Sequence, residues 1–100
     1  MEVGKLSNDE LKNKIFKNLD KNRDDILLSS SVGQDCAAID FGKFACILST
    51  DPITGAKEEI GKISVNVASN DIATAGVAPI GLMMTILAPS ETTVDDLEYI

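Results

Sequence analysis

The sequence predicts an α+β domain, with a mixed or antiparallel sheet flanked by helices, and three observations predict it. Apolar residues recur at helical spacing close to the amino terminus. Short apolar runs bounded by turn residues follow between residues 26 and 49. Small and apolar residues then recur at helical spacing over residues 60–75. A chain of 100 residues makes one domain at most, so a partner can be needed to complete its core.

The first predicted helix begins at Ser7. Ser7 and Glu10 have the spacing of a capping box, in which each side chain accepts a hydrogen bond from the backbone N–H of the other residue. The apolar stripe of this helix consists of Leu11, Ile15, Phe16 and Leu19. The opposite side is rich in lysine, so we expect the stripe to pack on another element.

A short strand is predicted at residues 26–28, with a hairpin after it. Residues 37–41 and 44–49 form two further strands, joined by Gly42 and Lys43. A two-residue connection with glycine first is compatible with a tight hairpin turn. The run 44–49 is almost continuously apolar, which is typical of a strand covered on both faces.

The next predicted elements are a helix over residues 60–75 and a third apolar strand over residues 80–88. Gly76 stands where the helix should end, because glycine adopts the left-handed conformation at little cost. Pro89 closes the strand, since proline lacks the N–H that a ladder requires.

A final helix is predicted near the end of the sequence, where acids occupy a first helical turn, with Ser90 or Thr92 as its cap. This helix reaches Ile100 soon after it begins. We therefore expect residues 1–100 to be the front piece of a longer protein, or a piece cut at a domain edge.

Composition and charge argue against several classes of function. Sixteen acids against nine bases give a formal net charge of −7, so neither a nucleic-acid surface nor binding to an anionic membrane is expected. The sequence has no histidine, which leaves carboxylates and hydroxyls for chemistry and favours hard cations such as Mg²⁺. Cys36 and Cys46 form no CxxC pair, and the first residues lack the apolar core of a signal peptide. We expect reduced thiols and a cytoplasmic location.

Three aspartates stand beside apolar segments rather than in solvated runs. Asp35 precedes a predicted strand, Asp51 ends one, and Asp71 lies within the second helix. Asp71 projects from a mostly apolar strip of that helix, where an unpaired charge is costly. Two or three carboxylates together with phosphate oxygens usually hold Mg²⁺ in nucleotide sites. The pattern therefore predicts that the three aspartates share a cation.

Each aspartate also has a simpler interpretation. Asp51 before Pro52 is a common start of a turn, and Asp35 can belong to an Asx turn. Asp71 can hydrogen-bond a serine or threonine on a neighbouring element. The three aspartates together favour the shared cation more than any one of them does.

Gly55 and Gly61 are candidates for contacts with phosphate. Gly61 stands at the start of the second helix, where free N–H groups and the helix dipole favour anions. Neither a Walker-A nor a GxGxxG spacing is present, so a flexible loop followed by a helix start is the competing interpretation. Lys57 and Lys62 either contact phosphate or are ordinary solvated lysines.

Three segments, in this order, resemble signatures of the aminoimidazole ribonucleotide (AIR) synthetase, or PurM-like, superfamily. Gly33–Ile39 resembles its G-x-D-A-A-V-I signature, Ser49–Ala56 its [ST]-T-D segment, and Val65–Pro79 its N-D-[LIV]-A-x-x-G-A-x-P helix. The resemblance covers about residues 30–90. The D-P-I-T-G-A run and the Ile-Gly pair before the helix are most similar to proteins related to the hydrogenase-maturation factor HypE, with thiamine-monophosphate kinase as the nearest rival.

The resemblance implies an amino-terminal ATP-binding domain whose strands pair with those of a second subunit. In such proteins, aspartates matching Asp35, Asp51 and Asp71 bind Mg²⁺ that bridges the nucleotide phosphates. The other residues expected at the nucleotide are Thr50, Gly55, Gly61 and Asn70. Gln34 departs from the pattern, because many members have a second acid there, and this is expected to lower the number of metal ions. Cys36 replaces the usual alanine.

The resemblance further implies an enzyme that uses ATP to activate an oxygen, by phosphorylation or dehydration of an amide or carbonyl. The alternatives are a phosphotransferase domain like thiamine-monophosphate kinase and a non-catalytic dimerisation module of the same fold. The resemblance also implies that residues 1–100 are the amino-terminal domain and that the carboxy-terminal domain is absent. Because that domain supplies much of the substrate site in the family, we expect the isolated chain to be inactive. The apolar strands exceed what three helices can cover, so we also expect a homodimer.

Overall fold

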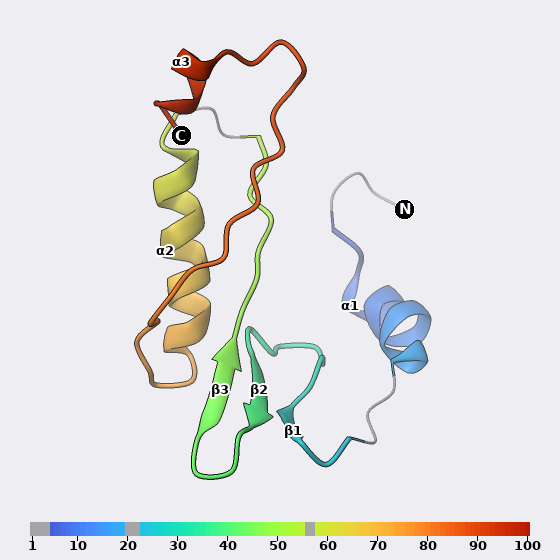
Figure 1. The fold of residues 1–100 in the computed structure, drawn as a ribbon. Coiled ribbons are helices and arrows are strands. Elements are labelled where there is room, and N and C mark those ends of the chain that lie inside the picture. Colours follow the sequence, from blue (N-terminus) through green and yellow to red (C-terminus); the bar gives the residue numbers. More distant parts are fainter. Residues whose placement is uncertain (1–4, 20–22, 56–57) are drawn as a thin grey trace. The chain divides into compact units, whose positions relative to one another are not determined.

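The structure is a computed structural model that describes residues 5–19, 23–55 and 58–100. Two compact units divide the chain, Met1–Leu48 and Ser49–Ile100, and Figure 1 shows their elements. Among the described residues, the amino-terminal unit contains a helical segment and a three-stranded antiparallel sheet, and the carboxy-terminal unit contains two helices. This content confirms the predicted α+β class.

The helical segment begins with the predicted cap at Ser7. The Ser7 N–H donates to Oε2 of Glu10 at 3.0 Å, and the Glu10 N–H donates to Oγ of Ser7 at 3.2 Å. Two hydrogen bonds from Ser7 lower the pKa of Glu10, and the bond from the backbone N–H has a larger effect than the bond from the hydroxyl. The segment consists of α1 (Asn8–Glu10), a wider π-helical turn η1 (Leu11–Ile15) and a 3₁₀ turn η2 (Phe16–Asn18).

The apolar stripe of this segment is covered only in part. Leu11 and Phe16 are half-buried, whereas Ile15 and Leu19 are exposed. The expected packing of the whole stripe on another element is therefore not found in the described part of this unit. An apolar helix face becomes buried only when a second surface lies along its full length.

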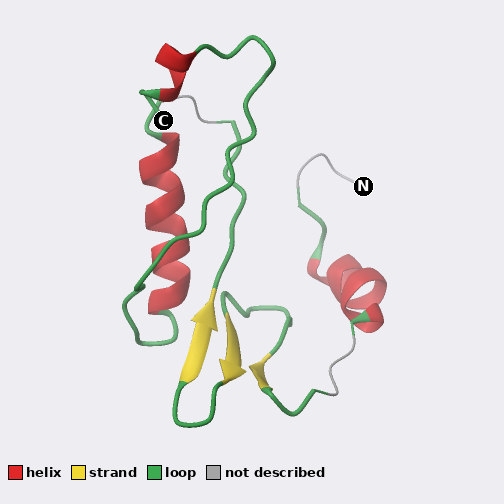
Figure 2. Ribbon diagram, in the orientation of Figure 1, coloured by secondary structure: helices red, strands yellow, loops and turns green. Residues whose placement is uncertain are grey.

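The sheet consists of β1 (Ile26–Leu28), β2 (Ala37–Asp40) and β3 (Ala45–Leu48), in that spatial order and all antiparallel. Figure 2 draws the strands of this meander as yellow arrows. Ala37 pairs with Leu48, so the start of β2 and the end of β3 lie at the same end of their ladder. All three predicted strands of this region are confirmed.

The hairpin between β2 and β3 has the predicted two-residue connection, Gly42 and Lys43. The Phe41 N–H donates to the Phe44 carbonyl at 2.8 Å, which closes the turn. Gly42 has φ +78°, a left-handed conformation that disfavours residues with a Cβ. Its N–H donates to Oδ1 of Asp40 at 2.8 Å.

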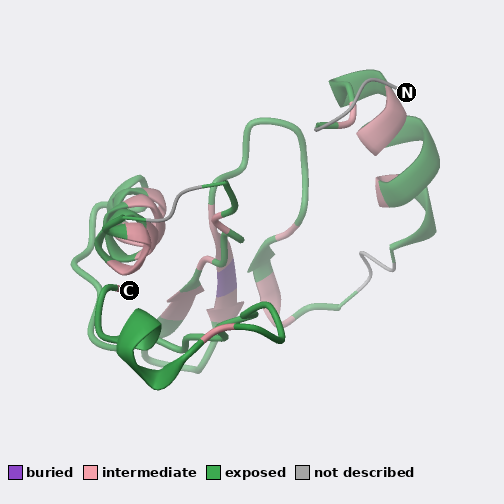
Figure 3. Cartoon of the chain, turned by 90° about the horizontal axis from the view of Figure 1, so that it is seen from above, coloured by how far each residue is buried: buried purple, intermediate pink, exposed green. Residues whose placement is uncertain are grey.

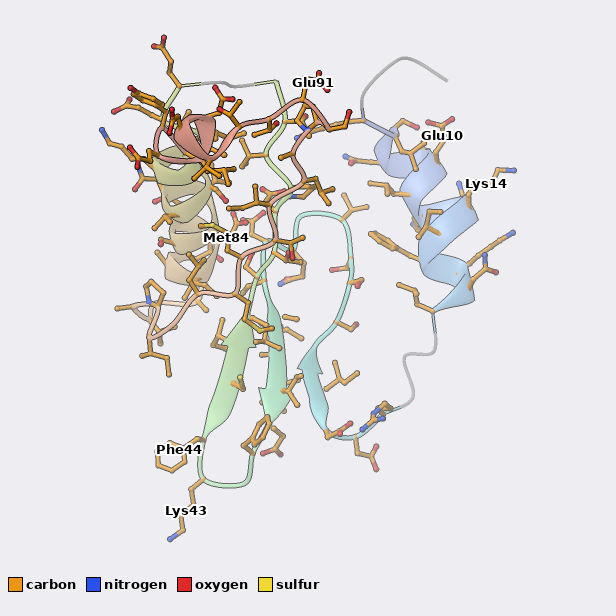
Figure 4. The ribbon with its side chains drawn as sticks, turned by 45° about the horizontal axis from the view of Figure 1, so that its top comes forward. Glu10, Lys14, Lys43, Phe44, Met84 and Glu91 are labelled. Atoms are coloured by element: carbon orange, nitrogen blue, oxygen red, sulfur yellow. The ribbon has the colours of Figure 1, made fainter. Side chains whose placement is uncertain are left out.

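The expectation that strand 44–49 is covered on both faces is wrong for this unit. Phe44 is 77 % exposed, and it projects from the hairpin tip beside Lys43 (Figure 4). Ala38 on β2 is the one buried apolar residue among those that the structure describes, at 3 % exposure, and it is the purple part of the sheet in Figure 3. A sheet face is buried only where a second layer packs on it.

The carboxy-terminal unit is built on α2 (Ile60–Ala73), which confirms the predicted second helix. Its N-cap, Glu59, has φ 55° and makes no side-chain capping hydrogen bond. Gly76 has φ +77°, and its N–H donates to the Ala73 carbonyl at 2.9 Å. Glycine therefore ends the helix where the sequence places it.

The apolar segment 77–89 is not a strand, which corrects the prediction for residues 80–88. It runs as an extended loop from the end of α2, drawn green in Figure 2. Ile80, Met83 and Leu87 on this loop are almost wholly exposed. A strand exists only when a neighbour pairs with its backbone, and no described residue of this unit forms a ladder with the segment.

The last helix is α3 (Val94–Leu97), and its cap is Thr93 instead of Ser90 or Thr92. Thr93 and Asp96 form a capping box, with the Thr93 N–H donating to Oδ2 of Asp96 at 2.8 Å. Hydrogen bonds from the Thr93 hydroxyl and backbone lower the pKa of Asp96. The Ser90 hydroxyl instead donates to Glu91 at 3.1 Å, so it does not reach the helix.

No helix in the described ranges is both long and apolar enough to cross a membrane.

Candidate magnesium and nucleotide site

Asp71 and Ser49 form the contact on which the candidate site is built. Asp71 lies near the end of α2, and Ser49 comes directly after β3 in the chain. The Ser49 hydroxyl donates to Oδ2 of Asp71 at 2.9 Å, and both side chains are half-buried. The bond joins the segment that carries Asp51 to the helix that carries Asp71.

The local sequence explains why Asp71 has this partner. Its helical neighbours include Val67 and Ala68, so its carboxylate emerges beside apolar side chains and needs a polar group. The structure thus bears out the simpler interpretation, that a serine on a neighbouring segment satisfies Asp71. An ionised carboxylate has about four acceptor sites, so this bond is compatible with a cation on the same group.

The other candidate residues of this unit lie on the loop after β3 and on α2. Thr50, Asp51 and Gly55 are exposed on the loop. Asn70 is exposed on α2, next to the half-buried Asp71. The loop and the helix therefore present carboxylate, hydroxyl and amide oxygens within one unit.

Gly61 lies in the first turn of α2 and meets the backbone of the chain end. Its N–H donates to the Ile100 carbonyl at 2.9 Å. A Cβ at this position would overlap with that carbonyl oxygen, so glycine allows the close approach. The N–H that the sequence assigns to phosphate thus has a backbone acceptor in this structure.

Asp35 belongs to the amino-terminal unit, in the exposed loop before β2. The hydrogen bond described above joins Ser49 and Asp71 within the carboxy-terminal unit. Asp35 is not a residue of that unit. Within the sequence, Asp35 shortly precedes β2 and Asp51 shortly follows β3, whose ends Ala37 and Leu48 are paired.

The donor set fits Mg²⁺ by its chemistry. The candidate ligands are carboxylate, hydroxyl and amide oxygens, which are hard ligands of the kind that Mg²⁺ and nucleotide phosphates share. Among the described residues, no group of three or more Asp, Glu, Cys or His side chains lies close enough together to hold a metal ion.

Ser49 is the site residue that the sequence analysis left unassigned. It stands first in the S-T-D run that predicted Thr50 and Asp51. Two features of the sequence point to Ser49. Asp71 needs a polar partner, and Ser49 places a hydroxyl at the end of an apolar strand. What the sequence does not show is which of its serines and threonines reaches the helix.

Comparison with known proteins agrees with these motifs. The family described as AIR synthase related protein, N-terminal domain, matches residues 33–100. The match contains the three segments that resemble the AIR synthetase superfamily, and the contact between Ser49 and Asp71 joins two of them. No curated protein and no solved structure matches the chain at a significant level. The chain therefore belongs to the AIR synthase related protein family, of which it carries the N-terminal domain.

Proposed function

We propose that this domain binds Mg²⁺ and ATP as part of an enzyme that uses ATP to activate an oxygen. The proposal rests on the match of residues 33–100 to the AIR synthase related family. The structural observation compatible with it is the hydrogen bond between Ser49 and Asp71 at 2.9 Å. It links the S-T-D segment to the helix with the N-D pair, and these are the two segments to which the resemblance assigns metal and phosphate. The all-oxygen donor set supports the same chemistry.

The proposed roles follow from the chemistry of each group. Asp35, Asp51 and Asp71 hold Mg²⁺, which when bound screens the charge of the nucleotide phosphates. Thr50 and Asn70 orient the carboxylates or the phosphates by hydrogen bonds. The backbone at Gly55 and Gly61 approaches the nucleotide, and a phosphate at Gly61 would take the place of the Ile100 carbonyl.

The acceptor of the reaction belongs to the same proposal. We propose phosphorylation or dehydration of an amide or carbonyl, with the substrate bound largely by a carboxy-terminal domain. Kinship with HypE, and thus a role in hydrogenase maturation, is supported by the run Asp51–Ala56 and by Ile60 before Gly61. A phosphotransferase like thiamine-monophosphate kinase is the rival within the family.

Calorimetric titration tests the proposal. The protein is titrated with a non-hydrolysable ATP analogue, with and without Mg²⁺. We expect saturable heat with Mg²⁺ that is lost in Asp51→Asn and kept in Asp24→Asn, the same change at an exposed aspartate of the amino-terminal unit. Absence of binding by the unaltered protein, or equal binding by Asp51→Asn, would contradict the proposed metal site.

We also propose that a second copy of the chain covers the segment 77–89. The almost wholly exposed Ile80, Met83 and Leu87 are unusual for a monomer, whose large apolar side chains are mostly covered. Figure 4 shows Met84 on the same loop. A partner strand would pair the backbone of the loop and bury these side chains together, as the resemblance implies.

Sedimentation at micromolar concentration tests this homodimer. We expect the mass of two chains for the unaltered protein and that of one chain for Met83→Glu, because a charge at a buried interface position is costly. Lys14→Glu, at an exposed site on η1 of the amino-terminal unit, serves as the control and should stay dimeric. A monomeric mass for the unaltered protein would contradict the dimer. A dimer that is indifferent to ATP and Mg²⁺ would favour the non-catalytic module.

A further inference from the structure

Ser49 has no role of its own in the proposed function, although its hydrogen bond to Asp71 supports that proposal. It opens the loop that carries Thr50 and Asp51, and its hydroxyl donates to Oδ2 of Asp71 at 2.9 Å. Ser49 and Asp71 are half-buried, whereas Thr50 and Asp51 are exposed. A hydrogen bond to a carboxylate in a half-buried place is shielded from competing water, so it constrains the group more than a surface bond does.

The carboxylate of Asp71 needs such a constraint to act as a ligand. The helix fixes the backbone and the first side-chain torsion, but the final torsion of an aspartate is broad. The plane of the carboxylate is therefore not set by α2 alone. A donor at one oxygen limits the rotation and leaves the other acceptor sites of the group in a defined direction.

We propose that Ser49 is a positioning residue that orients the Asp71 carboxylate toward Mg²⁺. This inference rests on the proposed function, because it takes Asp71 as a metal ligand. The same bond ties the start of the Asp51 loop to α2, so one hydroxyl restrains two of the three segments that carry the proposed metal-binding aspartates. Ser49 acts through Asp71, and its role differs from that of a group that itself contacts the ion.

The first measurement examines the hydrogen bond without metal or nucleotide. The carboxyl carbon resonance of Asp71, assigned by its loss in Asp71→Asn, is followed by NMR in the protein labelled with ¹³C-aspartate. We expect it to shift in Ser49→Ala and to stay in place in Ser64→Ala. Ser64 is a matched control, because it is a half-buried serine on α2 about two turns from Asp71. An unchanged resonance in Ser49→Ala would overturn the inference at this step.

The second measurement is the Mg²⁺ concentration needed for binding of the non-hydrolysable ATP analogue. Partners that orient a metal ligand typically change metal affinity 10- to 100-fold, so we expect Ser49→Ala to require about ten times more Mg²⁺. Ser49→Thr keeps the hydroxyl and should restore the affinity to within about threefold, a rescue that loss of packing alone would not show. Ser64→Ala should match the unaltered protein.

The outcomes separate the two proposals. If the unaltered protein shows no Mg²⁺-dependent binding although the Asp71 resonance responds to Ser49→Ala, the proposed function fails and the positioning role fails with it, while the hydrogen bond stands. If the unaltered protein binds and Ser49→Ala has the same Mg²⁺ requirement, only the positioning role is overturned. Equal weakening in Ser49→Ala and Ser49→Thr would likewise overturn it, because the hydroxyl would then be irrelevant.

Discussion

Asp71→Asn is expected to reduce Mg²⁺-dependent binding of an ATP analogue by at least about 100-fold, because loss of a ligand should exceed the 10- to 100-fold effect typical of outer partners. Asparagine has nearly the same volume and can still accept the Ser49 hydrogen bond. The change therefore removes the negative charge while it keeps the contact between the loop and α2. Calorimetric titration in the presence of Mg²⁺ measures the effect.

Asp95→Asn is the matched control for this result. Asp95 is an exposed aspartate on α3 of the same unit, outside the candidate site, so the chemical change is identical and the affinity should stay unaltered. Thermal unfolding of both variants shows whether the fold is kept. An unchanged affinity in Asp71→Asn, with an intact fold, would remove Asp71 from the metal site.

The second large effect concerns Gly61 and the stability of the protein. Gly61→Ala gains about 1 kcal/mol of helix propensity. It also places a Cβ against the Ile100 carbonyl and breaks the hydrogen bond between the Gly61 N–H and that oxygen. Overpacking costs about 1–3 kcal/mol and the lost bond about 0.5–1.5 kcal/mol, so after the gain in helix propensity we expect a net destabilisation of about 0.5–3.5 kcal/mol.

Urea unfolding measures this change, and amide hydrogen exchange at residue 61 reports the loss of the hydrogen bond. Asn66→Ala provides the control, because Asn66 is an exposed residue of the same helix and lies outside both the Ile100 contact and the proposed dimer interface. Its stability should stay within about 0.5 kcal/mol of the unaltered protein. If Gly61→Ala proves as stable as the unaltered protein or more stable, helix propensity dominates and the contact with Ile100 contributes nothing.

The elements that could be predicted are those that a few adjacent residues determine. Ser7 and Glu10 satisfy each other across one turn, and Gly42 supplies the conformation that the hairpin needs. The second helix is likewise predicted from the helical spacing of its small and apolar residues and from Gly76 at its end. Local sequence could not show that residues 80–88 form a loop instead of the predicted strand. The pairing of a strand depends on a partner that lies elsewhere in the sequence or on another chain.

The candidate site shows the same division. The need of Asp71 for a polar partner follows from its neighbours on the helix, and one of the interpretations drawn from the sequence named a serine or threonine. The identity of that partner, Ser49, depends on how the loop after β3 meets α2, which is a long-range contact. The shared cation of Asp35, Asp51 and Asp71 stays a prediction.

Two prolines within the segment 77–89 also bear on aggregation. An extended apolar run with an unpaired backbone is a template on which any compatible chain can add a strand, so a protein that exposes one must limit mispairing. Pro79 and Pro89 lack the N–H that would continue a ladder past either end. They limit the length over which a wrong partner can pair to the residues that lie between the two prolines.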